Sequence, residues 1–138
     1  MKMNHTKRLD FKKIKTIAIV GLSDKPDRPS YKVGKYLLGK GFKIFPVNPN
    51  IENFLGIKSY KTISDIKEKI DVVDIFRKSE LVEPIVEEAI KIGAKTIWMQ
   101  EGVINEKAAA KARSAGLTVV MNMCMMKEHK KKNLSKDF

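Results

Sequence analysis

The sequence predicts an α/β protein, a three-layer Rossmann-like domain with a mainly parallel, doubly wound sheet. Short continuous apolar runs recur along the chain, as is typical of strands buried on both faces of a parallel sheet. Amphipathic segments of about 11 to 14 residues alternate with these runs, a pattern that indicates βαβ units with right-handed crossovers. The length of 138 residues suits one domain with a sizeable core.

The first βα unit starts at residue 16. An apolar run over residues 16–20 ends at Gly21, which predicts a buried strand followed by a turn. A polar loop then leads to a helix expected over residues 30–40, with Ser30 as its N-cap and Gly41 as its stop. The loop therefore ends at a helix N-terminus.

The second and third strands are expected over residues 43–47 and 71–76. Pro46 removes a hydrogen-bond donor from the second strand, which is tolerable at the edge of a sheet or near a strand end. The segment between them is less regular, with room for a short strand at residues 54–60 and a brief helical turn at residues 64–66.

Two more helices and two more strands complete the predicted domain. Each helix begins at a capping residue and ends at a glycine, as helices commonly do. The helices are expected over residues 79–92, from Ser79 to Gly93, and over about 105–115, from Asn105 to Gly116; the strands are expected over 95–99 and 117–121.

The formal net charge of +12 is concentrated at the two ends of the chain. We expect a basic N-terminal tail over residues 1–13, the domain over residues 14–129 and a basic C-terminal tail over residues 130–138. Such tails can bind nucleic acid, but they are more often solvated ends that aid solubility. Nucleic acid is therefore not the partner we expect, and tail-mediated binding stays an alternative.

Other features restrict the class of protein. The first residues are polar and basic, and no apolar run approaches the roughly 18 residues of a membrane span, so we expect a cytoplasmic protein with no membrane partner. The single cysteine, Cys124, excludes an intramolecular disulfide and a Cys-based zinc site. With two histidines in all, we expect no metal site.

Ligands of open parallel sheets bind beyond the carboxyl ends of the strands, so the residues after each strand are the candidates. Gly21 permits close backbone approach, Ser23 offers a hydroxyl, and Lys25 and Arg28 add positive charge before the helix that starts near Ser30. Helix N-termini favour anions because of their free N–H groups and dipole. This loop, together with Ser30, is the predicted phosphate site.

The loop departs from the dinucleotide pattern G-x-G-x-x-G, because Ser23 stands at the second glycine. Asn48 follows the second strand where a ribose-binding acid is expected in NAD proteins, which favours NADP or coenzyme A over NAD. Arg77 follows the third strand, where it can pair with phosphate, and Gln100 follows the fourth, where it can contact the distal arm of a ligand or cap a helix.

Five segments together resemble the small stand-alone CoA-binding domain proteins. They are residues 19–31 (IVGLSDKPDRPSY), 46–50 (PVNPN), 71–77 (DVVDIFR), 87–95 (EEAIKIGAK) and 115–121 (AGLTVVM). The resemblance covers roughly residues 14–130, and this family is similar to the CoA-binding domain of succinyl-CoA synthetase alpha subunits.

The resemblance implies roles for individual residues. Gly21, Ser23, Lys25 and Arg28 would line the phosphates, Val47, Asn48 and Pro49 would flank the adenosine part, and Arg77 and Gln100 would border the remaining cleft. The chain departs from the family pattern at Glu101, where leucine is frequent. The phosphorylatable histidine of the synthetase lies outside the similar region, so ligase activity by this chain alone is not expected.

We therefore predict a protein that binds coenzyme A or an acyl-CoA as a non-catalytic or regulatory module, with no catalytic residue assigned and with room for an unidentified protein partner. An alternative is an enzyme or enzyme subunit that acts on acyl-CoA through Cys124 or His129. For that pair we favour a buried, inert cysteine and an exposed histidine. A sensor of NADP or NAD is a further alternative.

Overall fold

The computed structural model describes the backbone of residues 9–136 and the side chains of residues 9–132. Its centre is a five-stranded parallel sheet of order β2-β1-β5-β6-β7. The strands are β1 (Thr16–Val20), β2 (Lys43–Val47), β5 (Val72–Ile75), β6 (Thr96–Met99) and β7 (Thr118–Met121). All five strands expected from the sequence are thus present, and β2 with its Pro46 lies at an edge, one of the two positions that the sequence allowed for this proline.

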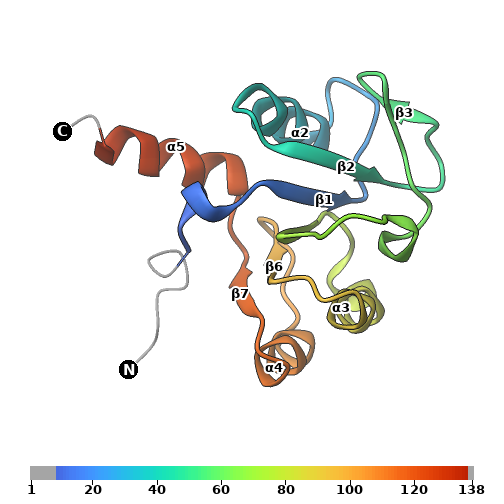
Figure 1. Ribbon diagram of the computed structural model, residues 1–138, viewed down its shortest axis with the longest axis vertical. Coiled ribbons are helices and arrows are strands. Elements are labelled where there is room, and N and C mark those ends of the chain that lie inside the picture. Colours follow the sequence, from blue (N-terminus) through green and yellow to red (C-terminus); the bar gives the residue numbers. More distant parts are fainter. Residues whose placement is uncertain (1–8, 137–138) are drawn as a thin grey trace.

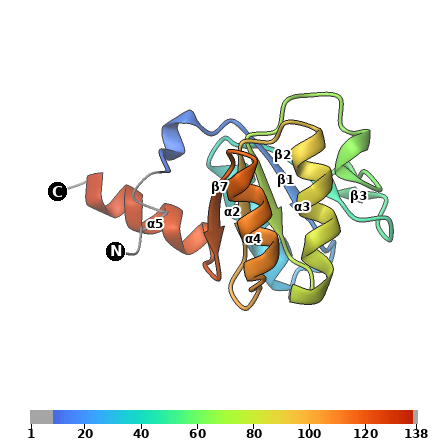
Figure 2. The same cartoon turned by 90° about the horizontal axis from the view of Figure 1, so that it is seen from below.

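Helices cover both faces of the sheet (Figures 1 and 2), which confirms the three-layer Rossmann-like architecture. Helices α2 (Pro29–Gly39) and α5 (Met125–Lys136) lie on one face, and α3 (Val82–Lys91) and α4 (Glu106–Ser114) lie on the other. Short 3-10 turns are η1 (Phe11–Lys13), η2 (Ile63–Asp65) and η3 (Ser79–Leu81), and β3 (Asn53–Phe54) pairs with β4 (Ile57–Lys58) in a small hairpin.

Each face of the sheet has its own apolar core, because successive strand residues point to opposite sides. Val73 and Ile75 of β5 pack toward α3 and α4, whereas Val72 packs with Trp98 and Met125 beneath α2 and α5. No helix in the described part of the chain is long and apolar enough to cross a membrane.

Two expected helix caps are wrong because the serine hydroxyls accept hydrogen bonds from N–H groups outside the helices that they were expected to cap. Helix α2 begins at Pro29 with Arg28 as its N-cap, and the Ser30 hydroxyl instead accepts a hydrogen bond from the Ser23 N–H at 2.9 Å. Ser79 begins η3 rather than α3, and its hydroxyl accepts a hydrogen bond from the Ile104 N–H at 2.9 Å. Asn105 caps α4 as expected.

The chain ends carry more structure than tails would. Helix α5 crosses the boundary expected at residue 129 and continues through Lys136, and η1 lies within the segment expected to be an N-terminal tail. Phe11 of η1 packs against Trp98 at a ring-centroid distance of 6.1 Å. The remaining tail residues, 1–8 and 137–138, lie outside the described residues.

Candidate functional site at the switch point of the sheet

The strand order reverses between β1 and β5, so the chain leaves these two neighbouring strands toward opposite faces of the sheet. Gly21 and Phe76 follow the two strands directly. The Gly21 N–H donates to the Val47 carbonyl and the Phe76 N–H donates to the Val20 carbonyl, each at 2.8 Å. Three strand ends therefore meet at this point, where ligands of open α/β sheets bind.

Gly21 is held in contact with the chain that leaves β5. A Cβ atom at residue 21 would lie 2.3 Å from the Phe76 carbonyl oxygen and 3.4 Å from the Arg77 side-chain Nε, and the φ angle is +88°. Only glycine fits both this space and this backbone conformation. The glycine thus brings the backbone of the β1–α2 loop beside the side chain of Arg77.

The loop between β1 and α2 is closed by hydrogen bonds among the residues that the sequence singled out. The Ser30 hydroxyl accepts from the Ser23 N–H, and the Ser23 hydroxyl accepts from the Lys25 N–H at 3.0 Å. The Arg28 N–H donates to the Lys25 carbonyl at 3.0 Å. Ser30 is buried, whereas the side chains of Lys25 and Arg28 are exposed and free to meet a ligand from the solvent side.

The N-terminus of α2 presents positive potential at the end of this loop. Its N-cap, Arg28, has a guanidinium that only donates hydrogen bonds, and the first helical residue is Pro29. The first turn of α2 contains no acidic residue. The backbone N–H groups of this turn and the helix dipole therefore favour an anion.

Asn48 joins the end of β2 to the β1–α2 loop. Its side-chain N–H donates to the Leu22 carbonyl at 3.0 Å, and its side-chain oxygen accepts from the Asn50 N–H at 2.9 Å. Val47 is buried and meets the loop through its carbonyl, while Pro49 is exposed. A hollow of about 490 Å³ lies beside them, lined by Asp24, Tyr31, Asn50, Ile51, Glu52, Asn53 and Leu55.

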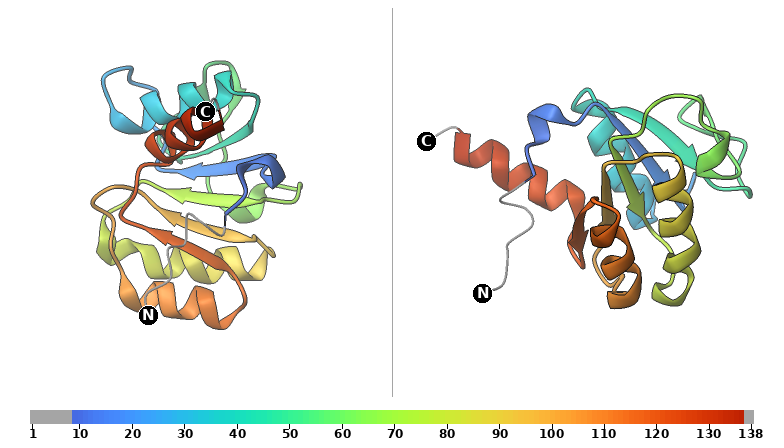
Figure 3. Two further views of the ribbon diagram at one scale, coloured as in Figure 1. Left: turned by 90° about the vertical axis from the view of Figure 1, so that its left-hand side faces the viewer. Right: turned by 60° about the horizontal axis from the view of Figure 1, so that its bottom comes forward.

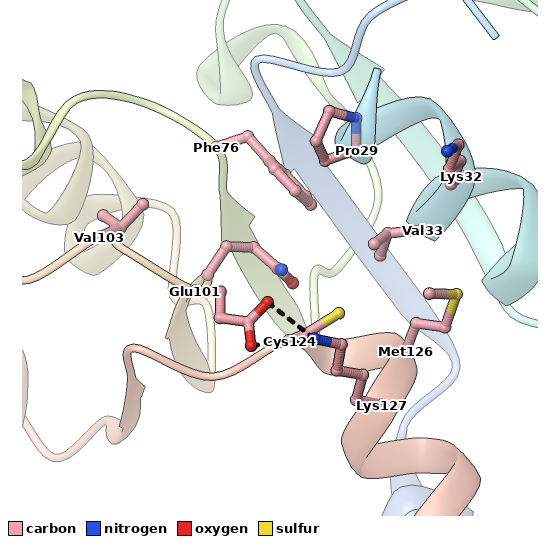
Figure 4. Close-up of a pocket in the computed structure, with 10 residues that line it drawn as sticks. Pro29, Lys32, Val33, Phe76, Glu101, Val103, Cys124, Met126 and Lys127 are labelled. Atoms are coloured by element: carbon pink, nitrogen blue, oxygen red, sulfur yellow. Dashed lines mark hydrogen bonds and ion pairs between the residues drawn. The ribbon is translucent and has the colours of Figure 1, made fainter. Parts of the chain in front are cut away.

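A cleft of about 520 Å³ opens between α2 and α5 (Figure 4). Its walls are mainly apolar, and charged side chains lie among them. The lining residues are Pro29, Lys32, Val33, Phe76, Gln100, Glu101, Val103, Cys124, Met126 and Lys127. The Lys127 ammonium lies 3.1 Å from the Glu101 carboxylate, and this hydrogen bond raises the pKa of Lys127 above its ordinary value.

Gln100 has a structural role as well as a place in the cleft wall. Its side chain is 3% exposed, and its oxygen accepts a hydrogen bond from the Met125 N–H at 3.0 Å. It thus satisfies one of the free N–H groups in the first turn of α5. Gln100 thus caps a helix, which is α5 rather than the helix directly after it. It also lines the cleft, where contact with the distal arm of a ligand stays a prediction.

Asp74 lies in β5 two residues before Phe76, and it is fully buried. Both carboxylate oxygens have no hydrogen-bond partner among the described residues. Burial raises the pKa of Asp74 well above its ordinary value. Burial therefore disfavours the charged form of this carboxyl group.

The cleft also contains residues that were not expected at the site from the sequence: Pro29, Lys32, Val33, Val103, Met126 and Lys127. Phe76, which stands beside Arg77 at a strand end, and Cys124, the possible nucleophile, line the cleft as well. The expectation of an exposed His129 is wrong. This residue is 7% exposed, and its Nδ1 lies 2.8 Å from the Tyr36 hydroxyl; Cys124 is buried at 6% exposure, as expected.

Comparison with known proteins places this geometry in a family. The model of a family described as a CoA binding domain matches residues 15–130. The chain belongs to this CoA-binding domain family. The aligned region includes the β1–α2 loop and the cleft residues of both flanking helices.

Relatives within the CoA-binding domain family differ in length. The uncharacterized protein YneT of Bacillus subtilis is 41% identical over 115 residues, which cover 83% of this chain and 85% of YneT. The ADP-forming acetate–CoA ligase of Methanocaldococcus jannaschii is 35% identical over 81 residues, which cover 59% of this chain but only 12% of the ligase. The similarity thus reaches one part of a much longer enzyme.

Solved structures show the same pattern. A hypothetical protein from Pyrococcus horikoshii is 44% identical, with a TM-score of 0.88 over 94% of this chain and 92% of that chain. The dinucleotide-forming acetyl-coenzyme A synthetase 1 of Candidatus Korarchaeum cryptofilum is 27% identical, with a TM-score of 0.68 over 78% of this chain and 26% of that chain.

Proposed function

We propose that this protein binds coenzyme A or an acyl-CoA as a binding or regulatory module. The phosphates would lie at Gly21, Ser23, Lys25 and Arg28, with Ser30 holding the loop. The adenosine part would lie beside Val47, Asn48 and Pro49, and Arg77 and Gln100 would border the cleft that takes the rest of the ligand.

The observation that supports this proposal best is the position of the cleft. Its volume of about 520 Å³ falls in the range of small-molecule sites, and it opens beside the uncapped N-terminus of α2 at the switch point of the sheet. An anion-favouring loop thus adjoins a mainly apolar cleft. Coenzyme A combines the two corresponding parts, a phosphate-rich nucleotide and a long, largely uncharged arm.

Calorimetric titration of ligand-free protein with coenzyme A, NAD, NADP and ATP tests the proposal. Selective binding of coenzyme A is the expected result. Selective binding of NAD or NADP would contradict it and make a redox sensor the leading function. Binding of ATP alone would indicate that the cleft does not contribute to recognition.

Arg28→Ala should weaken coenzyme A binding about five- to tenfold, equivalent to about 1–1.4 kcal/mol, because an exposed charge that faces phosphate is lost. The affinity should also depend less on salt. Calorimetry at two salt concentrations measures both effects. Lys91→Ala removes a charge from α3 and serves as the control; equal affinities of wild type and Arg28→Ala would exclude this role for Arg28.

A second candidate function, an enzyme or enzyme subunit acting on acyl-CoA, is supported by the position of Cys124 in the cleft wall. The Cys124 thiolate would attack the thioester carbonyl, forming an acyl-cysteine and releasing the thiolate of coenzyme A. If the protein has this second function, the purified wild type releases free coenzyme A from acyl-CoA, whereas the Cys124→Ser variant does not. An absence of release from a panel of acyl-CoAs, together with tight binding, would leave the binding module alone.

A further inference from the structure

One face of the molecule collects positive charge on two neighbouring helices. Helices α2 and α5 pack side by side on the same face of the sheet (Figure 3). Six lysines of these helices and the α2 C-cap define what we call the basic face: Lys32, Lys35, Lys40, Lys127, Lys130 and Lys132. Between residues 28 and 51 the chain contains no acidic residue at all.

The two helices bring like charges together at Tyr36. The Lys40 ammonium lies 5.4 Å from the centroid of the Tyr36 ring, and the Lys130 ammonium lies 5.3 Å from it. The Tyr36 hydroxyl is meanwhile held by His129 of α5. Two ammonium groups from different helices thus converge on one ring, and their repulsion is relieved when an anion binds between or beside them.

The opposite face of the sheet shows that the excess of positive charge is not spread evenly over the molecule. There, Lys111 of α4 lies 2.6 Å from Glu83 of α3 and 2.5 Å from Glu87, and Lys107 lies 3.8 Å from Glu83. A general richness in lysine would raise the charge of both faces alike. Of the six lysines on the basic face, only Lys127, which lies 3.1 Å from Glu101, forms an ion pair among the described residues. The excess of lysine on α2 and α5 therefore indicates a surface for a polyanion.

We propose that the basic face binds the phosphate backbone of nucleic acid without reading its sequence. All six residues are lysines, which act as point charges toward phosphate rather than as bidentate readers of bases. The large apolar side chains exposed in the described part of the chain, Leu55, Leu81 and Ile104, lie on other elements. The face thus presents no exposed large apolar side chain that could anchor it in a membrane.

This inference goes beyond coenzyme A binding and differs from the expectation based on the tails. Lys130 and Lys132, which fall within the expected C-terminal tail, belong to the folded helix α5. The other lysines of the basic face lie outside both expected tails. Lys32 and Lys127 also line the cleft, so the two proposed binding surfaces adjoin.

Fluorescence anisotropy with a labelled DNA duplex and a labelled single-stranded RNA tests the proposal on the full chain. We expect binding to both that weakens by at least about tenfold between about 50 and 200 mM salt. The double variant Lys35→Glu/Lys130→Glu should lose at least about tenfold in affinity at low salt. Lys58→Glu/Lys91→Glu, with the same change in net charge away from the basic face, should lose far less. Circular dichroism and coenzyme A titration of both variants establish that they remain folded.

Four outcomes would overturn the proposal: no binding at low salt, equal losses in the two double variants, loss of all binding on removal of residues 1–8, or binding to anionic vesicles without binding to nucleic acid. Coenzyme A affinity is measured separately, so a failure here leaves the proposed function intact.

Discussion

Gly21→Ala is expected to destabilise the fold by roughly 2–6 kcal/mol and to abolish ligand binding. Two costs add at this position. A Cβ atom would lie 2.3 Å from the Phe76 carbonyl oxygen, so two strand ends must separate, and the φ of +88° is itself strained for alanine. Separation of β1 from β5 at the switch point would also displace Arg77 from the β1–α2 loop, where we propose that phosphate binds.

Urea unfolding followed by circular dichroism measures the loss. Gly116→Ala is a matched control, because its φ is +89° and a Cβ atom there would meet nothing within 4 Å. Gly116→Ala should lower the free energy of unfolding by only about 1–2 kcal/mol, because only the backbone conformation is strained in this variant. If the two variants are equally stable, the close contact between Gly21 and Phe76 does not exist in solution.

The second large effect concerns Asp74 and has a defined dependence on pH. Burial raises the pKa of Asp74 in the folded chain, so the unfolded chain releases the proton at lower pH than the folded chain does. The contribution to stability is therefore fully present below the unfolded pKa of about 3.9 and is lost as the pH rises toward the folded pKa. In that window the free energy of unfolding should fall by up to about 1.4 kcal/mol per pH unit.

Asp74→Asn should remove this decline, so the variant gains stability relative to wild type as the pH rises above about 4. Asp71→Asn is a control, because the contribution of Asp71 to stability should change with pH in the opposite direction. Burial alone would raise the pKa of Asp71, but hydrogen bonds from the N–H groups of Lys15 and Thr16 outweigh it, with help from Lys95, and lower the pKa. Its contribution is present above the unfolded pKa and is lost as the pH falls.

Denaturant unfolding of the three proteins measures these differences, between about pH 4 and pH 8 for Asp74 and from about pH 4 downward for Asp71. A constant difference between wild type and Asp74→Asn across that range would mean that Asp74 is partnered or solvated in solution.

The sheet was predictable because each of its strands has a recognisable local sequence pattern. The apolar runs of β1, β2, β5 and β6 each end within two residues of a glycine, proline or charged residue, and the run of β7 follows Gly116. The alternation of these runs with helices predicts parallel strands, although it does not give their order. The position of the β1–α2 loop, our proposed phosphate site, was predictable for the same reason, since Gly21 to Arg28 directly follow the first strand. The part of the candidate site that belongs to a single βα unit was therefore predictable from local sequence.

Helix α5 could not be predicted in the same way. Its sequence is rich in lysine and has no clear apolar stripe, and its stability depends on distant partners. Met125 is fully buried beneath the helix, and its N–H is accepted by Gln100, which stands 25 residues earlier in the chain. The cleft between α2 and α5 was unpredictable for that reason, because one of its walls exists only once the tertiary structure has formed.

The attachment of α5 also has an optical consequence. Trp98 is the single tryptophan of the chain, and its indole N–H donates a 2.8 Å hydrogen bond to the carbonyl of Met123, two residues before α5 begins. Its ring is fully buried and packs against Phe11 of η1. Intrinsic emission from this indole therefore reports on how α5 and η1 are seated, so a ligand that shifts α5 changes the spectrum without any attached dye.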